Sequence, residues 1–239
     1  SKGSSTIEWL EKNFKSRKFY DTIYVTANPY VSLKVSDSFY EIVEVWKTAF
    51  NEEVGTVLPR DVVKYAFESF EEDKRLIVHF IQPHYPFLTM KKDWKDCIKF
   101  MRIDALHGSD YLREKVNLKK HPIDVYEALQ MGLIDKNKVW KGYKSNLELV
   151  WKYARKLIEK LPGKTVVTSD HGEMMGERIL FLPIRGYGHP RGLRNPELIE
   201  VPWLEFDDER RKIKAPSPLE KIRIRKSVRK FIKTHRTGV

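Results

Sequence analysis

Apolar residues along the chain occur either in short continuous runs or at the spacing of a helix face. The continuous runs are rich in β-branched residues and have the length of a buried strand. They cover residues 23–26, 76–81, 165–168 and 199–204. Each run therefore predicts a strand that is covered on both faces.

Two segments between these runs have apolar residues three or four positions apart, as one face of a helix requires. The clearer one covers residues 143–161 and ends at Pro162-Gly163, a typical helix stop. The second follows Pro59 and covers residues 59–70. Strands separated by helices indicate right-handed crossovers and a largely parallel sheet. The fold class predicted is α/β, with one domain over residues 1–206.

Positive charge is concentrated at the end of the chain. The chain has 45 Lys+Arg and 33 Asp+Glu, a net charge of +12. Residues 207–239 hold twelve Lys/Arg and four Asp/Glu, which leaves only +4 for residues 1–206. Such a tail suits nucleic acid or an acidic membrane surface. We favour an amphipathic helix that closes the domain and begins at Ser217, because Phe231 is the one aromatic residue available for base stacking.

Composition excludes several classes of protein. One Cys rules out an internal disulfide, and no run of about eighteen apolar residues is present to span a membrane. The first residues, SKGSST, lack the apolar stretch of a secretory signal. We therefore expect a chain with no membrane span and a cytoplasmic location.

Polar residues follow three of the predicted strands. Asn28 comes after the first strand, His84 after the second, and Asp170-His171 directly after the third. In open parallel sheets, ligands bind where the carboxyl ends of strands meet loops. The pattern therefore predicts a site that gathers these residues.

Asp170 and His171 have the ligand chemistry of a metal site. A carboxylate and an imidazole favour Zn or Mn over Ca. Gly172 gives the backbone freedom to turn sharply after them. The alternative is structural, with Asp170 capping a turn and His171 bonded to a loop.

A glycine-rich loop follows eighteen residues later and presents His189 between Gly and Pro. Arg191 and Arg194 in the same loop add positive charge that suits an anionic ligand.

Residues 165–173, with Gly176-Glu177, Tyr187-Gly188-His189 and Val201-Pro202, resemble the C-terminal half of the sulfatase/alkaline phosphatase superfamily. The closest resemblance is to archaeal sulfatase-like proteins. Pro83-His84-Tyr85-Pro86 is similar to that family's Pro-His-x-Pro segment, and residues 143–161 to the helix before its metal-binding strand. The resemblance covers most of residues 6–205 and implies a three-layer α/β/α, alkaline phosphatase-like fold.

The resemblance also implies roles for individual residues. Asp170 and His171 would hold a divalent metal that activates a nucleophile, with Zn or Mn favoured and Mg or Ca as alternatives. His189 would bind a second metal or contact the transferred group. His84 would act near the phosphate or sulfate oxygens, and Arg191, Arg194 and Asn28 would bind substrate.

The nucleophile is expected at the start of a helix, where free N–H groups favour an anion. The resemblance points to Thr6, with Ser5 as runner-up. Ser5 and Glu8 also have the spacing of a capping box, in which Ser5 would act only as a cap. The one Cys, Cys97, lacks the Pro and Arg that mark formylglycine formation, which disfavours a formylglycine sulfatase.

One part of the family pattern has no counterpart. The family begins with a strand that ends in a metal-binding Asp, and only five residues precede Thr6 here. Asp21 or Asp104 could take the place of that carboxylate.

The leading hypothesis is a metal-dependent hydrolase or transferase of anionic small-molecule esters, phosphate rather than sulfate. The alternative is an inactive module of the same fold that binds an anionic partner through Arg191, Arg194 and the basic tail. Binding of nucleic acid by the tail alone ranks third.

Overall fold

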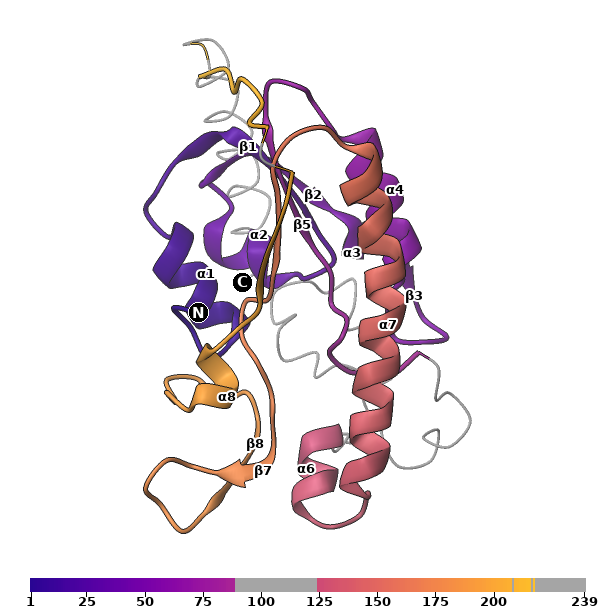
Figure 1. The fold of residues 1–239 in the computed structure, drawn as a ribbon, viewed down its shortest axis with the longest axis vertical. Coiled ribbons are helices and arrows are strands. Elements are labelled where there is room, and N and C mark those ends of the chain that lie inside the picture. The colour runs from indigo at the N-terminus through magenta and orange to yellow at the C-terminus, as the bar shows by residue number, and fades with distance from the viewer. Residues whose placement is uncertain (89–123, 208, 216, 218–239) are drawn as a thin grey trace, which may run out of the picture.

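A three-stranded parallel sheet forms the centre of the protein. The computed structural model describes residues 1–88, 124–207, 209–215 and 217. The sheet has the strand order β2-β1-β5, with β1 at Phe19–Thr26, β2 at Phe39–Glu44 and β5 at Arg75–His79 (Figure 1). Helices connect these strands, and the fold is therefore α/β, as the sequence predicts.

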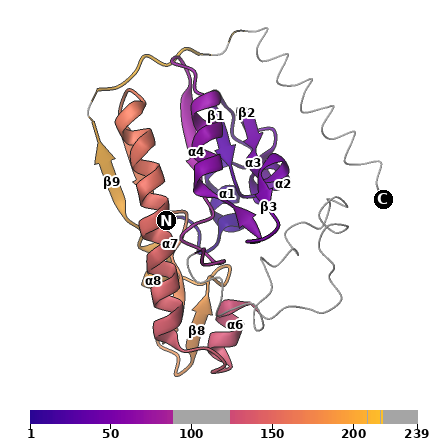
Figure 2. The same ribbon diagram turned by 90° about the vertical axis from the view of Figure 1, so that its right-hand side faces the viewer.

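Helices cover both faces of this sheet because the residues of β1 alternate between two apolar clusters. Ile23 and Val25 pack with residues of α4 (Pro59–Glu68) and α7 (Lys136–Lys160). Tyr24 packs with residues of α1 (Thr6–Phe14) and α2 (Tyr30–Val35). In Figure 1, α1 and α2 lie on one side of the strands and α4 and α7 on the other, and Figure 2 views the protein from the side of α4 and α7.

Short elements complete the described part of the chain. Next to the sheet are α3 (Val45–Thr48), β3 (Phe50–Asn51) and β4 (Thr56–Val57). The second half of the chain adds α6 (Val125–Gln130), β6 (Thr165–Thr168), β7 (Met174–Arg178), β8 (Arg185–Gly188), α8 (Pro196–Ile199) and β9 (Trp203–Phe206).

The predicted helices are confirmed. The segment 143–161 lies in α7, which begins seven residues earlier than its apolar pattern, at a cap formed by Asp135. The segment after Pro59 is α4, with the proline in the first turn, where its missing N–H costs no hydrogen bond.

The predicted strands are confirmed only in part. Residues 23–26 lie in β1, and residues 76–79 of the predicted 76–81 lie in β5. The prediction for 199–204 is wrong at its start, because Pro196–Ile199 is helical and β9 begins only after Pro202. β2 is not among the predicted strands, although Phe39, Ile42 and Val43 are residue types typical of a strand.

The strand before Asp170 does not join the parallel sheet. Within the described residues β6 pairs with β9 alone, in an antiparallel ribbon of two strands. Residues of β5, β6 and α7 line one large and mainly apolar cavity. The prediction of one sheet that includes residues 165–168 is therefore wrong, because β6 has β9 as its partner in a separate ribbon.

The end of the described chain packs beside the start of β5. Arg211 lies over the ring of Phe70 and donates to the carbonyl oxygens of Glu71 and Glu72. The predicted tail helix after Ser217 lies outside the described residues. No helix among the described residues is long and apolar enough to cross a membrane.

Candidate active site

Thr6 is the first residue of α1, the position expected for a nucleophile. The predicted capping box between Ser5 and Glu8 is wrong, because the Ser5 side chain makes no cap hydrogen bond. Glu8 Oε2 instead accepts from the backbone N and the hydroxyl of Ser4, at 2.9 and 3.0 Å. Ser5 is buried and, among the described residues, its hydroxyl has no partner.

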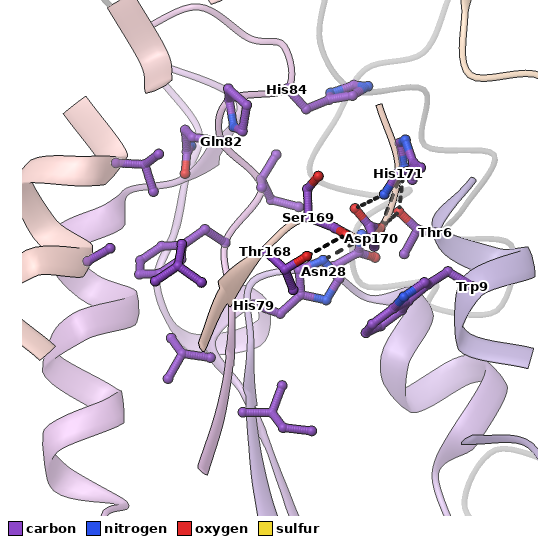
Figure 3. A pocket seen from close by; sticks show the side chains of 18 of the residues that line it. Thr6, Trp9, Asn28, His79, Gln82, His84, Thr168, Ser169, Asp170 and His171 are labelled. Carbon is purple, nitrogen blue, oxygen red and sulfur yellow. Dashed lines mark hydrogen bonds and ion pairs between the residues drawn. The ribbon is translucent and has the colours of Figure 1, made fainter. Parts of the chain in front are cut away.

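The Thr6 hydroxyl lies against both residues that follow β6. Thr6 Oγ1 donates to Asp170 Oδ2 at 2.6 Å and lies 3.2 Å from His171 Nε2 (Figure 3). The structure thus brings together one hydroxyl, one carboxylate and one imidazole from segments more than 160 residues apart. The Thr6 hydroxyl has one proton and faces two acceptors, so it can donate a hydrogen bond to only one of them.

The backbone fixes which nitrogen of His171 is free. Its Nδ1 lies 2.9 Å from the carbonyl oxygen of Gly172, which can only accept a hydrogen bond. We therefore assign the proton of the neutral ring to Nδ1 and a lone pair to Nε2, the atom that faces Thr6. A backbone carbonyl orients many metal-binding histidines in the same way.

Gly172 serves a different purpose from the one the sequence suggests. A Cβ at this position would lie 2.0 Å from the carbonyl oxygen of Glu197. The Gly172 N–H donates to the Leu198 carbonyl oxygen at 2.9 Å. The glycine is therefore needed for close approach to α8, which places the adjacent His171.

His79 is a site residue that sequence reasoning missed. It ends β5, and its Nε2 lies 3.9 Å from Asp170 Oδ2. The Tyr24 hydroxyl lies 3.0 Å from its other ring nitrogen, Nδ1, and orients the ring. Its position at the end of a predicted strand is the sequence feature that could have identified it as a site residue.

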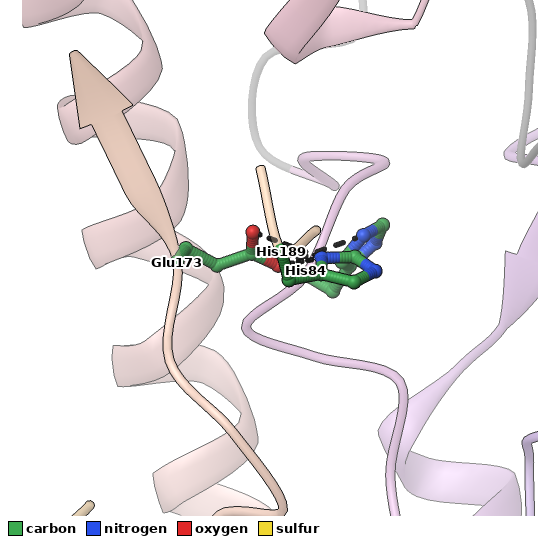
Figure 4. A group of neighbouring side chains, drawn as sticks. All are labelled: His84, Glu173 and His189. Carbon is green, nitrogen blue, oxygen red and sulfur yellow. Dashed lines mark hydrogen bonds and ion pairs between the residues drawn. The ribbon is translucent and has the colours of Figure 1, made fainter. Parts of the chain in front are cut away.

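A second group of side chains lies beside the first. His84, Glu173 and His189 each offer one ligand atom, and these atoms lie within 4.8 Å of one another (Figure 4). The rings of His189 and His171 are 4.4 Å apart between centroids, so the two groups adjoin. This His-Glu-His group could hold a metal ion.

The members of the second group come from three loops. His84 follows β5, and Glu173 follows Gly172 directly before β7. His189 follows β8, which pairs with β7 and thereby brings His189 back toward Glu173. Sequence reasoning missed Glu173 as a candidate ligand, although it lies within the matched segment 165–173.

Asn146 holds the loop that carries His84. This side chain on α7 is fully buried. Its amide nitrogen donates to the carbonyl oxygens of His84 and Pro86 at 3.0 and 2.9 Å, and its Oδ1 accepts from the Leu88 N–H at 2.9 Å. One amide thus fixes the loop by several hydrogen bonds.

Both carboxylates of the site favour the ionised form. Burial raises the pKa of Asp170, but the neighbouring imidazoles of His171 and His79, together with the Thr6 hydrogen bond, lower it below its usual value. Burial likewise opposes ionisation of Glu173, and the adjacent His189 and His84 hold its pKa low. The site therefore presents two negative charges to a cation.

The histidines divide into two kinds. Burial lowers the pKa of His79 and of His84, which favours their neutral, ligand-capable form. Burial acts in the same direction on His189, but the charge and hydrogen bond of Glu173 outweigh it and raise the pKa.

The two arginines predicted to bind substrate do not line the cavity. Arg191 pairs with Glu11 at 2.6 Å, and Arg194 pairs with Glu8 at 2.5 Å. Both acidic partners lie on α1, so the arginines hold the His189 loop to that helix. Asn28 does line the cavity, and its Oδ1 accepts from the Tyr30 N–H at 2.9 Å.

His189, expected to bind a second metal or to contact the transferred group, lies in the His-Glu-His group. Asp21 cannot supply a missing carboxylate, because it lies near the start of β1 and pairs with Arg75 at the amino end of β5. The site lies at the opposite end of these strands, beyond His79. Asp104 and Cys97 lie outside the described residues.

No family model, curated protein or solved structure matches the chain.

Proposed function

We propose that this protein is a metal-dependent hydrolase or transferase of phosphate esters, and less readily of sulfate esters, with Thr6 as nucleophile. The observation that carries the proposal is the contact of Thr6 Oγ1 with Asp170 Oδ2 and His171 Nε2, at 2.6 and 3.2 Å. The resemblance to the sulfatase/alkaline phosphatase superfamily supports it, and so do the helices on both faces of the sheet. A three-layer, alkaline phosphatase-like architecture is part of the proposal.

The residues present fit a divalent metal beside Thr6. Asp170 supplies an ionised carboxylate, and the His171 hydrogen bond to Gly172 leaves Nε2 with a free lone pair. Together with the Thr6 oxygen they form a mixed oxygen and nitrogen donor set, which suits Zn or Mn, with Mg or Ca as alternatives. When bound, such a metal supplies Lewis-acid polarisation and lowers the pKa of the nucleophile.

Thr6 is placed to attack an anionic ester. It opens α1, and the start of a helix favours an anionic group. Its oxygen would form a bond to phosphorus while the ester oxygen leaves and takes up a proton. Water then cleaves the Thr6 ester, which releases phosphate and restores the hydroxyl.

Three other residues have roles in the proposed reaction. Asp170 accepts the Thr6 hydrogen bond, and His79 faces the same carboxylate oxygen at 3.9 Å. His84 lines the same cavity, where it can donate or accept a proton at the ester. The partner proposed is therefore an anionic small-molecule ester.

Turnover of model esters tests the proposal. We would assay p-nitrophenyl phosphate, bis-p-nitrophenyl phosphate and p-nitrophenyl sulfate with added Zn or Mn. Thr6→Val removes the hydroxyl at nearly constant shape and is expected to abolish turnover, whereas Thr6→Ser retains part of it. Ser5→Ala separates the two candidate nucleophiles and is expected to remain active.

Two results would contradict the proposal. One is full activity in Thr6→Val, and the other is no turnover of any of these esters by protein that has bound metal. Loss of activity in Ser5→Ala with retention in Thr6→Val would move the nucleophile to Ser5.

A further inference from the structure

The loop between β7 and β8 exposes an uninterrupted apolar segment. Residues 179–184 read Ile-Leu-Phe-Leu-Pro-Ile, with no polar side chain among them. Phe181 is 98% exposed, and Leu180, Leu182 and Ile184 are each about half exposed. We call these four residues the apolar tip. Such a run of exposed apolar residues is unfavourable in water, and patches of this kind mark interaction sites.

Hydrogen bonds hold the apolar tip in its outward position. Asn195 is buried, and its Oδ1 accepts from the Leu180 N–H at 3.1 Å while its Nδ2 donates to the Arg178 carbonyl oxygen at 2.7 Å. Within the loop, the Leu182 N–H donates to the Ile179 carbonyl oxygen at 2.8 Å. The backbone of the loop is therefore fixed by a buried amide, and the apolar side chains point outward instead of folding back onto the protein.

A second pair of exposed apolar residues lies at the same end of the molecule. Met131 and Leu133, in the turn between α6 and α7, are each 63% exposed. Lys136 at the start of α7 pairs with Glu177 of β7 at 2.9 Å, which holds this turn beside the β7–β8 loop. The turn and the loop both lie at the lower end of the protein in Figure 1 and in Figure 2.

Positive charge flanks both apolar segments. Residues 131–141 and 176–185 hold five Lys/Arg and two Asp/Glu. Both acids are already engaged, one in the ion pair just described and one as the cap of α7. Arg178 ends β7 and Arg185 begins β8, and both are exposed and pair with no carboxylate among the described residues. The apolar tip therefore lies between two positive charges.

We infer from this combination that the protein binds the surface of an anionic lipid bilayer, with the apolar tip inserted among the lipids and Arg178 and Arg185 at the level of the headgroup phosphates. Apolar side chains gain free energy when they leave water, and Lys or Arg near an anionic surface adds electrostatic attraction. A guanidinium also suits phosphate, because it can donate two parallel hydrogen bonds. The contact is peripheral and does not depend on the chemistry proposed for Thr6.

A partner protein is the main alternative. In protein interfaces an apolar anchor enters a pocket of matching shape, and hydrogen bonds around it fix the orientation of the partner. Residues 179–184 carry no side chain that could make such hydrogen bonds, whereas a fluid lipid layer needs none. Positive charge on both sides of the loop also matches a surface that is negative throughout. Both observations favour the lipid surface.

Co-sedimentation with vesicles tests the inference. The full chain would be mixed with vesicles of phosphatidylcholine and phosphatidylglycerol, and with vesicles of phosphatidylcholine alone. We expect binding to the anionic vesicles that weakens as salt is added, and much weaker binding to the neutral vesicles. Phe181→Ser should weaken binding to the anionic vesicles roughly ten- to a hundredfold, because it removes one large apolar side chain from the inserted segment. Circular dichroism checks that this variant is folded.

Matched variants separate the apolar tip from the rest of the surface. Leu33→Ser removes an exposed apolar side chain from α2, away from the lower end of the protein in Figure 1, and should bind as the wild type does. Arg178→Gln should weaken binding to the anionic vesicles several-fold. Lys34→Gln, also on α2, changes the net charge by the same amount and should have a smaller effect.

Insertion of the tip needs its own measurement, because the basic residues 207–239 can also attract the chain to an anionic surface. The chain has one Cys, so Phe181→Cys in a Cys97→Ala background carries a single thiol for a fluorophore that reports the polarity around it. We expect the emission of this label to shift to the blue when anionic vesicles are added. The same label on Leu33→Cys should not shift.

Four results would overturn the inference. One is a wild type that does not bind anionic vesicles, and another is binding that a folded Phe181→Ser protein retains in full. A label at residue 181 that stays in water on the bound chain would assign the binding to other residues, such as the basic tail. If Phe181→Ser changes the mass of the protein in sedimentation velocity but not its binding to vesicles, the tip is a contact between two copies of the chain.

Discussion

Replacement of Gly172 by alanine gives the sharpest test of how the site is held in place. The new Cβ would lie 2.0 Å from the Glu197 carbonyl oxygen, 3.1 Å from the carbon of that carbonyl and 3.5 Å from Leu198 Cα. A carbon and an oxygen need about 3.3 Å, so the two backbone segments must separate by about 1 Å. Because all three contacts are with backbone atoms, a side-chain rotation cannot relieve the clash.

The magnitude follows from the two interactions that change. Overpacking of this kind costs about 1–3 kcal/mol. The hydrogen bond from the Gly172 N–H to the Leu198 carbonyl oxygen, 2.9 Å long, joins the same segments and would be weakened at a cost of about 1 kcal/mol. We therefore expect Gly172→Ala to lower the free energy of unfolding by about 2–4 kcal/mol.

Thermal and urea unfolding measure this effect. For a chain of this size, a loss of that order lowers the midpoint of thermal unfolding by roughly 5–15 °C. Gly132→Ala is the control, because nothing lies within 4 Å of an added Cβ there. Gly132 has a positive φ of 70°, so alanine costs only the local backbone strain of about 1–2 kcal/mol.

Metal binding at the site should also be weakened, since Gly172 directly follows His171. We expect Gly172→Ala to bind zinc more weakly than Gly132→Ala at a temperature where both are folded. The reasoning is refuted if Gly172→Ala unfolds at the wild-type midpoint, or if Gly132→Ala is the more damaging of the two.

Two further predictions concern residues that support the site. Asn146→Ala should lower the free energy of unfolding by about 3 kcal/mol, because it leaves buried backbone groups of the His84 loop without hydrogen-bond partners. Urea unfolding measures this loss. Ser145→Ala on the same helix is the control and should lower the free energy of unfolding much less. Burial opposes ionisation of Glu8, but hydrogen bonds from Lys12 and Ser4 lower its pKa from 4.5 to about 2, so its contribution to stability is present above pH 4.5 and is lost as the pH falls toward 2. Urea unfolding should therefore show that Glu8→Gln is less stable than the wild type at pH 7 and that its stability changes less than that of the wild type between pH 4.5 and 2. The same pH dependence in Glu8→Gln and in the wild type would contradict this.

The sequence predicts the local features of the fold well. The apolar spacing of α7 and α4 identifies both helices, because an amphipathic pattern depends only on neighbours within the same segment. The pairing of strands depends on distant segments, so local sequence does not predict it, as β6 shows. Its composition predicts a strand correctly, but nothing in residues 165–168 indicates that β9, rather than the parallel sheet, is its partner.

In the candidate site, too, some residues can be predicted from local sequence and others depend on contacts between distant segments. Asp170 and His171 can be proposed from residue type and from their position after a strand, whereas the choice of Thr6 at the helix start rests on the resemblance. The roles of His79, Glu173 and Asn146 arise only when separate loops meet. The positive charge of Arg191 and Arg194 suggests a substrate role, but their partners on α1 are about 180 residues away in the sequence and become visible only in the structure.

The most direct test of the account is a search for the covalent ester on Thr6. The metal-loaded protein would be mixed with p-nitrophenyl phosphate, quenched in acid within the first turnover, and digested for mass spectrometry. We predict that the peptide containing Thr6 gains the mass of one phosphoryl group, located on the Thr6 hydroxyl, and that Thr6→Val gains none. Turnover without phosphorylation of this peptide, or the same phosphorylation in Thr6→Val, would contradict the assignment of Thr6 as nucleophile.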